Sequence, residues 1–148
     1  MDITSILMVC RGNICRSPMA EGYFAKQFND LKSSTLVSSA GLAALIDQPA
    51  DDHAQKIMVQ HGISLSSHRA RQLTNNLVRK NDLILVMSYS QLQQLTSQFI
   101  TAKGKTFLLG HWNQIEIEDP YTKPAEAFLK VYQKIESAWQ KWKTRILQ

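Results

Sequence analysis

The sequence predicts a single α/β domain, residues 1–148, in which a small parallel sheet of about four strands lies between two layers of helices. Short apolar runs alternate along the chain with segments whose apolar residues recur at helical spacing. The clearest run, from Leu83 to Met87, is apolar at every position, which is typical of a parallel strand covered by helices on both faces. No repeat or low-complexity segment interrupts the alternation, and the length is that of one domain.

The first strand is the apolar run from Ile6 to Val9, and the first helix follows it after a short loop. Pro18 fits the first helical position, because the N–H that proline lacks would be unpaired there. The other elements follow from the same two patterns. We expect further strands at residues 35–38, 83–87 and 106–109, and helices at residues 19–28, 50–60, 74–80, 89–99 and 124–147.

Composition and charge limit the possible functions. An apolar fraction of 44% with 20% charged residues is ordinary for a globular protein. The net charge of +5 comes from scattered lysines and arginines that form no stripe with exposed aromatic residues, so we expect no nucleic-acid partner but some attraction of anionic substrates. No apolar run is long enough to span a bilayer and the first residues lack a charged leader, so we expect no membrane insertion and a cytoplasmic location.

The loop from Cys10 to Ser17 places a nucleophile between a strand and a helix. A loop of this length over a helix N-terminus points several backbone N–H groups at one spot, where the helix dipole adds to their positive potential. Cys10 begins the loop, and both the N–H groups and Arg16 favour its thiolate form. The planar guanidinium of Arg16 matches two oxygens of a phosphate group. The loop is therefore predicted to bind a phosphate beside a reactive cysteine.

The other loop residues suit the same structure. Gly12 permits a crowded backbone, Asn13 can hold the loop by side-chain hydrogen bonds, and Ser17 can donate its hydroxyl to the thiolate. The ten residues that end at Pro18 read V-C-x-G-N-I-C-R-S-P, and they resemble the signature of the low-molecular-weight protein tyrosine phosphatases. This resemblance implies a phosphate-binding loop formed by Arg11, Gly12, Asn13, Ile14, Cys15, Arg16 and Ser17, with Cys10 and Arg16 catalytic.

A phosphatase of this kind needs an acid that protonates the leaving phenol. From the residues alone, Glu116, Glu118 and Asp119 are candidates, since all three lie between the last strand and the last helix. The sequence Asp119-Pro120-Tyr121 resembles the D-P-Y motif that carries the general acid of the family. The resemblance therefore implies that Asp119 is the acid.

Further residues match the family by position. Ser39 resembles the serine that hydrogen-bonds the loop asparagine, and His68 resembles the histidine of the same network. The remaining histidines, His53, His61 and His111, have no such match and are expected at the surface or at helix ends. The family pocket implies a substrate wall of Arg11, Leu42, Leu45 and Tyr121, which should be shallow because no aromatic residue occupies positions 43–45.

The similarity extends nearly end to end and is strongest to bacterial members that act on membrane tyrosine autokinases in capsule and exopolysaccharide production. Residues 39–47, 104–112 and 118–121 carry it. It implies hydrolysis of phosphotyrosine through a phosphocysteine intermediate, with no metal or organic cofactor.

Several alternatives stay open. Arginine phosphatases of the same family carry threonine where this chain has Ile14, so the apolar side chain favours phosphotyrosine. Arsenate reductases of this fold need additional cysteines after Cys15, and the chain has none. A non-catalytic phosphotyrosine-binding module would be expected to lose Cys10, Arg16 or Asp119. Cys15 is either a small buried loop residue or the partner of Cys10 in a regulatory disulfide, and phosphorylation of Tyr121 is a further possibility.

Overall fold

The computed structural model describes residues 2–147, which form one four-stranded parallel sheet with the strand order β2-β1-β3-β4. The strands are β1 (Ser5–Cys10), β2 (Leu36–Gly41), β3 (Leu83–Val86) and β4 (Thr106–Leu108). The α-helices are α1 (Arg16–Asp30), α2 (Asp52–Gln60), α3 (Asn75–Lys80), α4 (Tyr89–Gln98) and α5 (Ala125–Ile146). Short 3-10 helices at Ile100–Ala102 and His111–Asn113 were not predicted.

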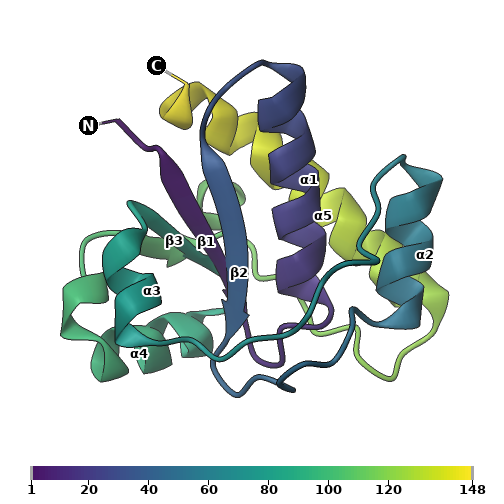
Figure 1. The fold of residues 1–148 in the computed structure, drawn as a ribbon, viewed down its shortest axis with the longest axis horizontal. Coiled ribbons are helices and arrows are strands. Elements are labelled where there is room, and N and C mark those ends of the chain that lie inside the picture. The colour runs from purple at the N-terminus through teal and green to yellow at the C-terminus, as the bar shows by residue number, and fades with distance from the viewer. Residues whose placement is uncertain (1, 148) are drawn as a thin grey trace.

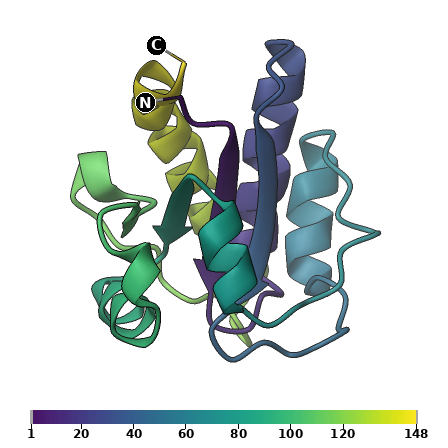
Figure 2. The same cartoon turned by 60° about the vertical axis from the view of Figure 1, so that its left-hand side comes forward.

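The sheet lies between two layers of helices, as predicted. Helices α1 and α5 cover one face, with α2 packed against these two helices away from the sheet, and α3 and α4 cover the other face (Figures 1 and 2). Successive residues of β1 point to opposite faces: Ile6 and Met8 join the core under α1 and α5, whereas Leu7 and Val9 join the core under α3 and α4. Both faces of the strand are buried, which explains its uninterrupted apolar sequence.

The long helix α5 is held by aromatic packing. Trp139 is 2% exposed, and its ring makes edge-to-face contacts with Phe24 and Phe28 of α1 at centroid distances of 5.1 and 5.0 Å. Such contacts add to the free energy of burying the rings. The apolar stripe of the last helix is therefore core packing, and α1 is fixed against the sheet beneath it.

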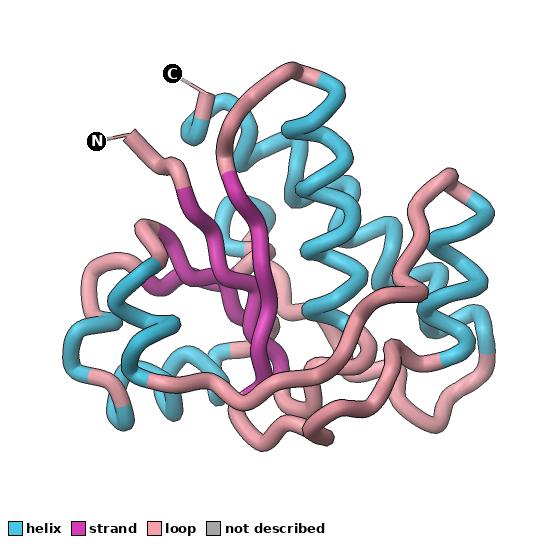
Figure 3. Tube along the Cα trace, in the orientation of Figure 1, coloured by secondary structure: helices cyan, strands magenta, loops and turns pink. Residues whose placement is uncertain are grey.

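The strand order places the site. From β1 the chain continues to β2 on one side, and from β3 it continues to β4 on the other, so the segments that follow the adjacent strands β1 and β3 leave the sheet in opposite directions. The longer loops gather at this end of the molecule (Figure 3). Among residues 2–147, no helix combines the length and the apolar character that crossing a membrane requires.

Most predicted boundaries agree with the structure to within two residues, and two of those that differ have identifiable reasons. β2 extends to Gly41 rather than ending at residue 38, because Gly41 pairs with Cys10 at the end of β1. A Cβ at position 41 would lie 2.7 Å from the carbonyl oxygen of Arg11, so only glycine fits there. α1 begins at Arg16, which makes Pro18 its third residue rather than its first. Proline is tolerated there because first-turn N–H groups have no partner within the helix.

Candidate active site

The loop after β1 turns its carbonyl groups outward. The backbone N–H groups of residues 42, 43, 45 and 51 donate to the carbonyl oxygens of residues 10, 11, 12 and 14 at 2.8–3.1 Å. His68 donates from Nε2 to the carbonyl of Asn13 at 2.7 Å, and Met19 N–H donates to the carbonyl of Cys15 at 3.1 Å. Every carbonyl from Cys10 to Cys15 is therefore bound from outside the loop.

The N–H groups of the same loop point the other way. None of the backbone N–H groups of residues 11–17 donates to an acceptor among residues 2–147. A planar trans peptide directs its N–H opposite to its C=O, so these groups converge on the inner side of the loop. Asn13, with a φ of 61°, takes the left-handed conformation that the curl requires. The loop and the start of α1 together form a cradle for an anion.

Cys10 lies at the floor of this cradle, 3% exposed, with its Sγ 2.9 Å from Ser17 Oγ. Asn13 donates from Nδ2 to the same Ser17 oxygen at 2.8 Å, which leaves the Ser17 proton for Cys10. The Asn13 amide is oriented by the N–H of Arg71, which donates to Asn13 Oδ1 at 2.9 Å. A thiolate can only accept hydrogen bonds, and in this order of donors the Ser17 hydroxyl is the group that donates to Cys10 Sγ.

Ser39 extends this network behind the loop. Asn13 donates its second Nδ2 hydrogen to Ser39 Oγ at 2.9 Å, and Ser39 donates onward to Glu21 Oε1 at 2.5 Å. The Arg71 side chain donates from Nε to the Ser39 carbonyl at 2.8 Å. The structure thus brings together Asn13, Ser17, Ser39 and His68. Glu21 was missed, although it lies one helical turn after Ser17 and hence on the same face of α1.

Arg16 is 5% exposed and reaches across to the segment after β4. Its Nη1 donates to the carbonyl of Ile117 at 2.9 Å, and its Nη2 lies 3.8 Å from Asp119 Oδ2. The buried Nε has no acceptor among the described residues. Arg16 is therefore held in place by the opposite wall and retains donors for a bound anion.

Of the three candidate acids, only Asp119 lines the pocket above Cys10. Its side chain is half exposed, and Oδ1 accepts from the N–H of Tyr121 at 3.1 Å. Glu116 instead accepts from the N–H of Tyr89 at the start of α4 at 2.7 Å. Glu118 lines a separate hollow against α5.

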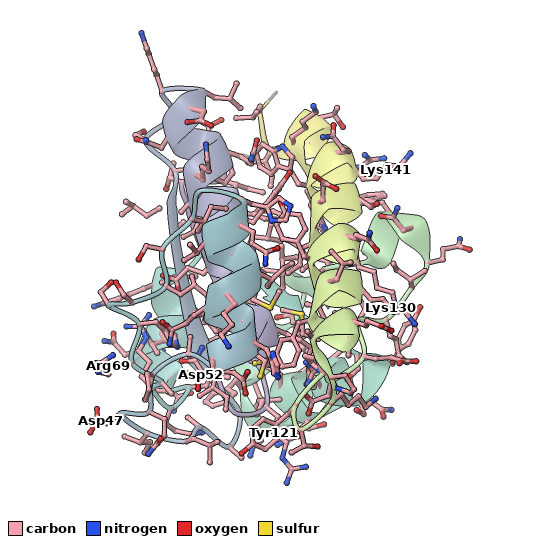
Figure 4. The ribbon with its side chains drawn as sticks, turned by 90° about the vertical axis from the view of Figure 1, so that its right-hand side faces the viewer. Asp47, Asp52, Arg69, Tyr121, Lys130 and Lys141 are labelled. Atoms are coloured by element: carbon pink, nitrogen blue, oxygen red, sulfur yellow. The ribbon has the colours of Figure 1, made fainter. Side chains whose placement is uncertain are left out.

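The pocket has a volume of about 370 Å³ and opens between two exposed side chains, Leu45 and Tyr121. Tyr121 lies at the end of the molecule where the loops gather (Figure 4). Arg11, Ala43 and Ile14 complete the wall. Leu42 does not line this pocket: its side chain is 8% exposed and packs in the core under α3 and α4, while Ala43 takes the position on the pocket and Leu42 borders an adjoining hollow.

Cys15 is buried, and burial together with the nearby carboxylate of Asp51 raises the pKa of its thiol far above the usual range. Both cysteines are free thiols in this structure. A disulfide between Cys10 and Cys15 stays a prediction. Within residues 2–147, no three His, Cys, Asp or Glu side chains are placed to hold a metal ion.

None of the three remaining histidines lines the pocket above Cys10. His61 caps the C-terminus of α2, stacks on Tyr132 at a centroid distance of 3.9 Å and contacts the carbonyl of Ile57. His111 packs edge-on against Phe107. These are structural positions at helix ends and on the surface of the core.

Comparison with known proteins agrees with this geometry. Residues 5–148 match the family model described as low molecular weight phosphotyrosine protein phosphatase. The probable low molecular weight protein-tyrosine-phosphatase AmsI of Erwinia amylovora is 45% identical over 141 residues, which cover 95% of each chain. The tyrosine phosphatase Wzb from Escherichia coli K30, solved in complex with sulphate, superposes with a TM-score of 0.90 at 41% identity and covers 97% of this chain and 99% of its own.

A more distant structure has the same fold. The YwlE arginine phosphatase, solved with a phosphorylated serine in place of its active-site cysteine, has a TM-score of 0.92 at 27% identity, covering 97% of this chain and 96% of its own. The family model covers nearly the whole chain, and the identity to named relatives exceeds 40%. This chain therefore belongs to the low-molecular-weight phosphotyrosine protein phosphatase family.

Proposed function

We propose that this chain hydrolyses phosphotyrosine in proteins in two steps, with Cys10 as the nucleophile. The observation that carries the proposal is the position of Cys10 Sγ, 2.9 Å from the Ser17 hydroxyl at the floor of a cradle of inward N–H groups. In the first step the thiolate attacks phosphorus, while the N–H groups and Arg16 hold the non-bridging oxygens. An S–P bond forms as the P–O bond to tyrosine breaks.

Asp119 supplies the proton for the departing tyrosine oxygen and becomes a carboxylate. In the second step water attacks the phosphocysteine, Asp119 takes a proton from that water, and the S–P bond breaks. The Ser17 hydroxyl stabilises the thiolate that leaves. Inorganic phosphate is released, and Cys10 and Asp119 return to their starting states. Besides the substrate and water, the proposed chemistry uses only groups of this chain.

The shape of the pocket supports an aromatic substrate. The exposed side chains of Leu45 and Tyr121 stand on the rim above Cys10, where they can contact the faces of a phenyl ring. Ile14 adds an apolar surface on the same wall. A phosphoserine side chain is too short to use these contacts, so phosphotyrosine fits better.

For the physiological partner we propose a membrane tyrosine autokinase of capsule or exopolysaccharide production, which is what the sequence resemblance to the bacterial members implies. The similarity to the tyrosine phosphatase Wzb and to AmsI supports this assignment. A cytoplasmic location is part of the proposal, because a thiolate nucleophile needs a reducing compartment.

The test is steady-state phosphate release at pH about 6 from a phosphotyrosine peptide and a phosphoarginine peptide. Cys10→Ser should be inactive, and Asp119→Ala should lose on the order of 10²-fold in kcat with the tyrosine peptide. Glu118→Ala is the matched control, since this neighbouring carboxylate does not line the Cys10 pocket and its loss should leave kcat unchanged. The Asp119 effect should shrink with p-nitrophenyl phosphate, whose leaving group needs less protonation.

Faster turnover of the phosphoarginine peptide would mean that phosphoarginine, not phosphotyrosine, is the substrate of the same active site. This outcome is tested because the YwlE arginine phosphatase has a similar structure. Binding of phosphotyrosine without release of phosphate would contradict the proposal that the chain is an enzyme.

A further inference from the structure

A second hollow adjoins the pocket above Cys10 on the side of α4. Its volume is about 430 Å³, and it shares Arg11, Arg16, Ala43 and Asp119 with that pocket. The rest of its lining is polar apart from Leu42, and comprises Ser88, Ser90, Gln91 and Gln94. A peptide whose phosphotyrosine occupies the first pocket would therefore place a neighbouring residue in this hollow.

Hydrogen-bond donors dominate this lining. Gln91 is 7% exposed, and its Oε1 accepts from the N–H of Met87 at 2.9 Å, which fixes the orientation of the amide. Its Nε2 has no acceptor among the described residues, although Gln91 contributes to the wall of the hollow. An amide whose oxygen is used and whose nitrogen is free offers donors to a ligand.

Arg11 provides the charge. Its guanidinium is exposed and makes no ion pair or hydrogen bond with residues 2–147. Ser88 and Ser90 add two hydroxyls, 3.1 Å apart, at the start of α4. The carboxylate on the border, Asp119, is itself 3.8 Å from Arg16. The hollow therefore combines one uncompensated cation with several neutral donors.

The opposite side of the pocket has the reverse charge. There a hollow beside Leu45 and Tyr121 includes Asp51 and Asp52 in its lining. Asp52 and the neighbouring Asp47 lie with Tyr121 at the same end of the molecule (Figure 4). An acidic substrate residue would be repelled on this side and attracted on the side of α4.

We propose that the hollow at α4 is a specificity subsite for an anionic side chain of the substrate, a carboxylate or a phosphate, within a few residues of the target phosphotyrosine. The inference rests on the proposed function and adds the substrate class. The guanidinium of Arg11 attracts the anion, and the Gln91 amide and the serine hydroxyls donate to its oxygens. Gln94, exposed on the next turn of α4, lines the entrance to the subsite.

The experiment changes the charge of the subsite and of the peptide together. Peptides with one phosphotyrosine carry Gln, Glu, Lys or a second phosphotyrosine at one flanking position, on either side of the target. Wild type is compared with Gln94→Glu and Gln94→Lys. Gln93→Glu is the matched control, because Gln93 precedes Gln94 on α4 and is exposed but does not line the hollow.

Wild type should have the higher kcat/KM for peptides with Glu or phosphotyrosine at one flank. Gln94→Glu should reduce that preference roughly two- to fivefold, Gln94→Lys should increase it by a similar factor, and Gln93→Glu should change it less. The glutamate and phosphotyrosine arms distinguish a carboxylate from a phosphate ligand. The preference should weaken with added salt, as expected for partly exposed charges.

Two outcomes would overturn the subsite: equal kcat/KM for all flanks in wild type, or equal effects of the substitutions at 93 and 94. Free phosphotyrosine separates this failure from that of the proposed function, since it reports the chemistry without a flanking residue. Turnover of free phosphotyrosine without flank preference would refute the subsite alone.

Discussion

Replacing Ser17 by alanine should slow the second chemical step more than the first. The Ser17 hydroxyl lies 2.9 Å from Cys10 Sγ, and its own oxygen already accepts from Asn13 at 2.8 Å. In the phosphocysteine the sulfur carries no charge, and it regains its charge as it leaves. A hydrogen bond to a charged group contributes about 1.5–3 kcal/mol, which corresponds to a rate loss of about 10- to 150-fold if the whole bond is gained at the transition state.

The assay is stopped-flow release of p-nitrophenol from p-nitrophenyl phosphate. Once hydrolysis of the intermediate is slow, the Ser17→Ala enzyme should show a burst approaching about one product per active site, followed by a slow steady phase. Ser39→Ala is the matched control. Both substitutions remove a hydroxyl that accepts from Asn13 Nδ2, at 2.8 and 2.9 Å, but only Ser17 contacts Cys10.

Comparing the two variants also separates chemistry from folding. Each leaves one Asn13 hydrogen unpaired in a buried site, so each should lower the free energy of unfolding by about 1–3 kcal/mol. Equal losses of kcat in the two variants would show that Ser17 acts only by holding the loop. Absence of a burst in Ser17→Ala would refute the role in stabilising the leaving thiolate.

Two further predictions concern titratable groups. Hydrogen bonds from the backbone and side chain of Thr4 lower the pKa of Asp82 in the folded protein. The Asp82 carboxylate therefore stabilises the fold at pH values above its unfolded-state pKa of about 3.9, and this contribution is lost as the pH falls through the lower folded-state pKa. Asp82→Asn should therefore reduce the free energy of unfolding, measured in urea at pH 7, by roughly 0.5–1 kcal/mol, the range expected for an interaction at the protein surface. Near about pH 2 the substitution should have no measurable effect. An equal loss at both pH values would contradict this prediction. Because burial raises the pKa of Cys15, iodoacetamide at neutral pH should label Cys10 alone, with phosphate protecting it, and comparable labelling of Cys15 in a peptide map would contradict the assignment.

The elements with a local pattern could be predicted from the sequence. β3 is apolar at every position because both of its faces are buried, and α5 carries an apolar stripe because one face packs on the sheet and α1. The end of β2 was misplaced because small and polar residues follow Ser38: Ser39, Ala40 and Gly41 belong to the strand, yet Ser39 is buried to bond Asn13 rather than to fill an apolar core. Hydrophobic periodicity cannot reveal a strand residue whose partner is a polar network.

In the candidate site, too, some residues could be predicted from a local sequence pattern and others could not. Cys10 and Arg16 belong to one contiguous motif, so the loop geometry followed from spacing. The positions of Leu42 and Ala43 depend on hydrogen bonds between their segment and the loop, which set which side chain faces the pocket. Glu21 could be assigned to the network behind the loop only from the structure, in which Ser39 donates a hydrogen bond to it. Residues that act through distant partners leave no local signal in the sequence.

The segment that binds the loop carbonyls also builds the pocket wall, and the two tasks use different atoms. Ala43 and Leu45 hold the loop by their backbone N–H groups, while their side chains line the pocket above Cys10. Any residue except proline supplies the same N–H. Substitutions at positions 43 and 45 can therefore change substrate preference among related proteins while the backbone hydrogen bonds that hold the phosphate-binding loop remain. A proline at either position would change the pocket wall and also remove one of these hydrogen bonds.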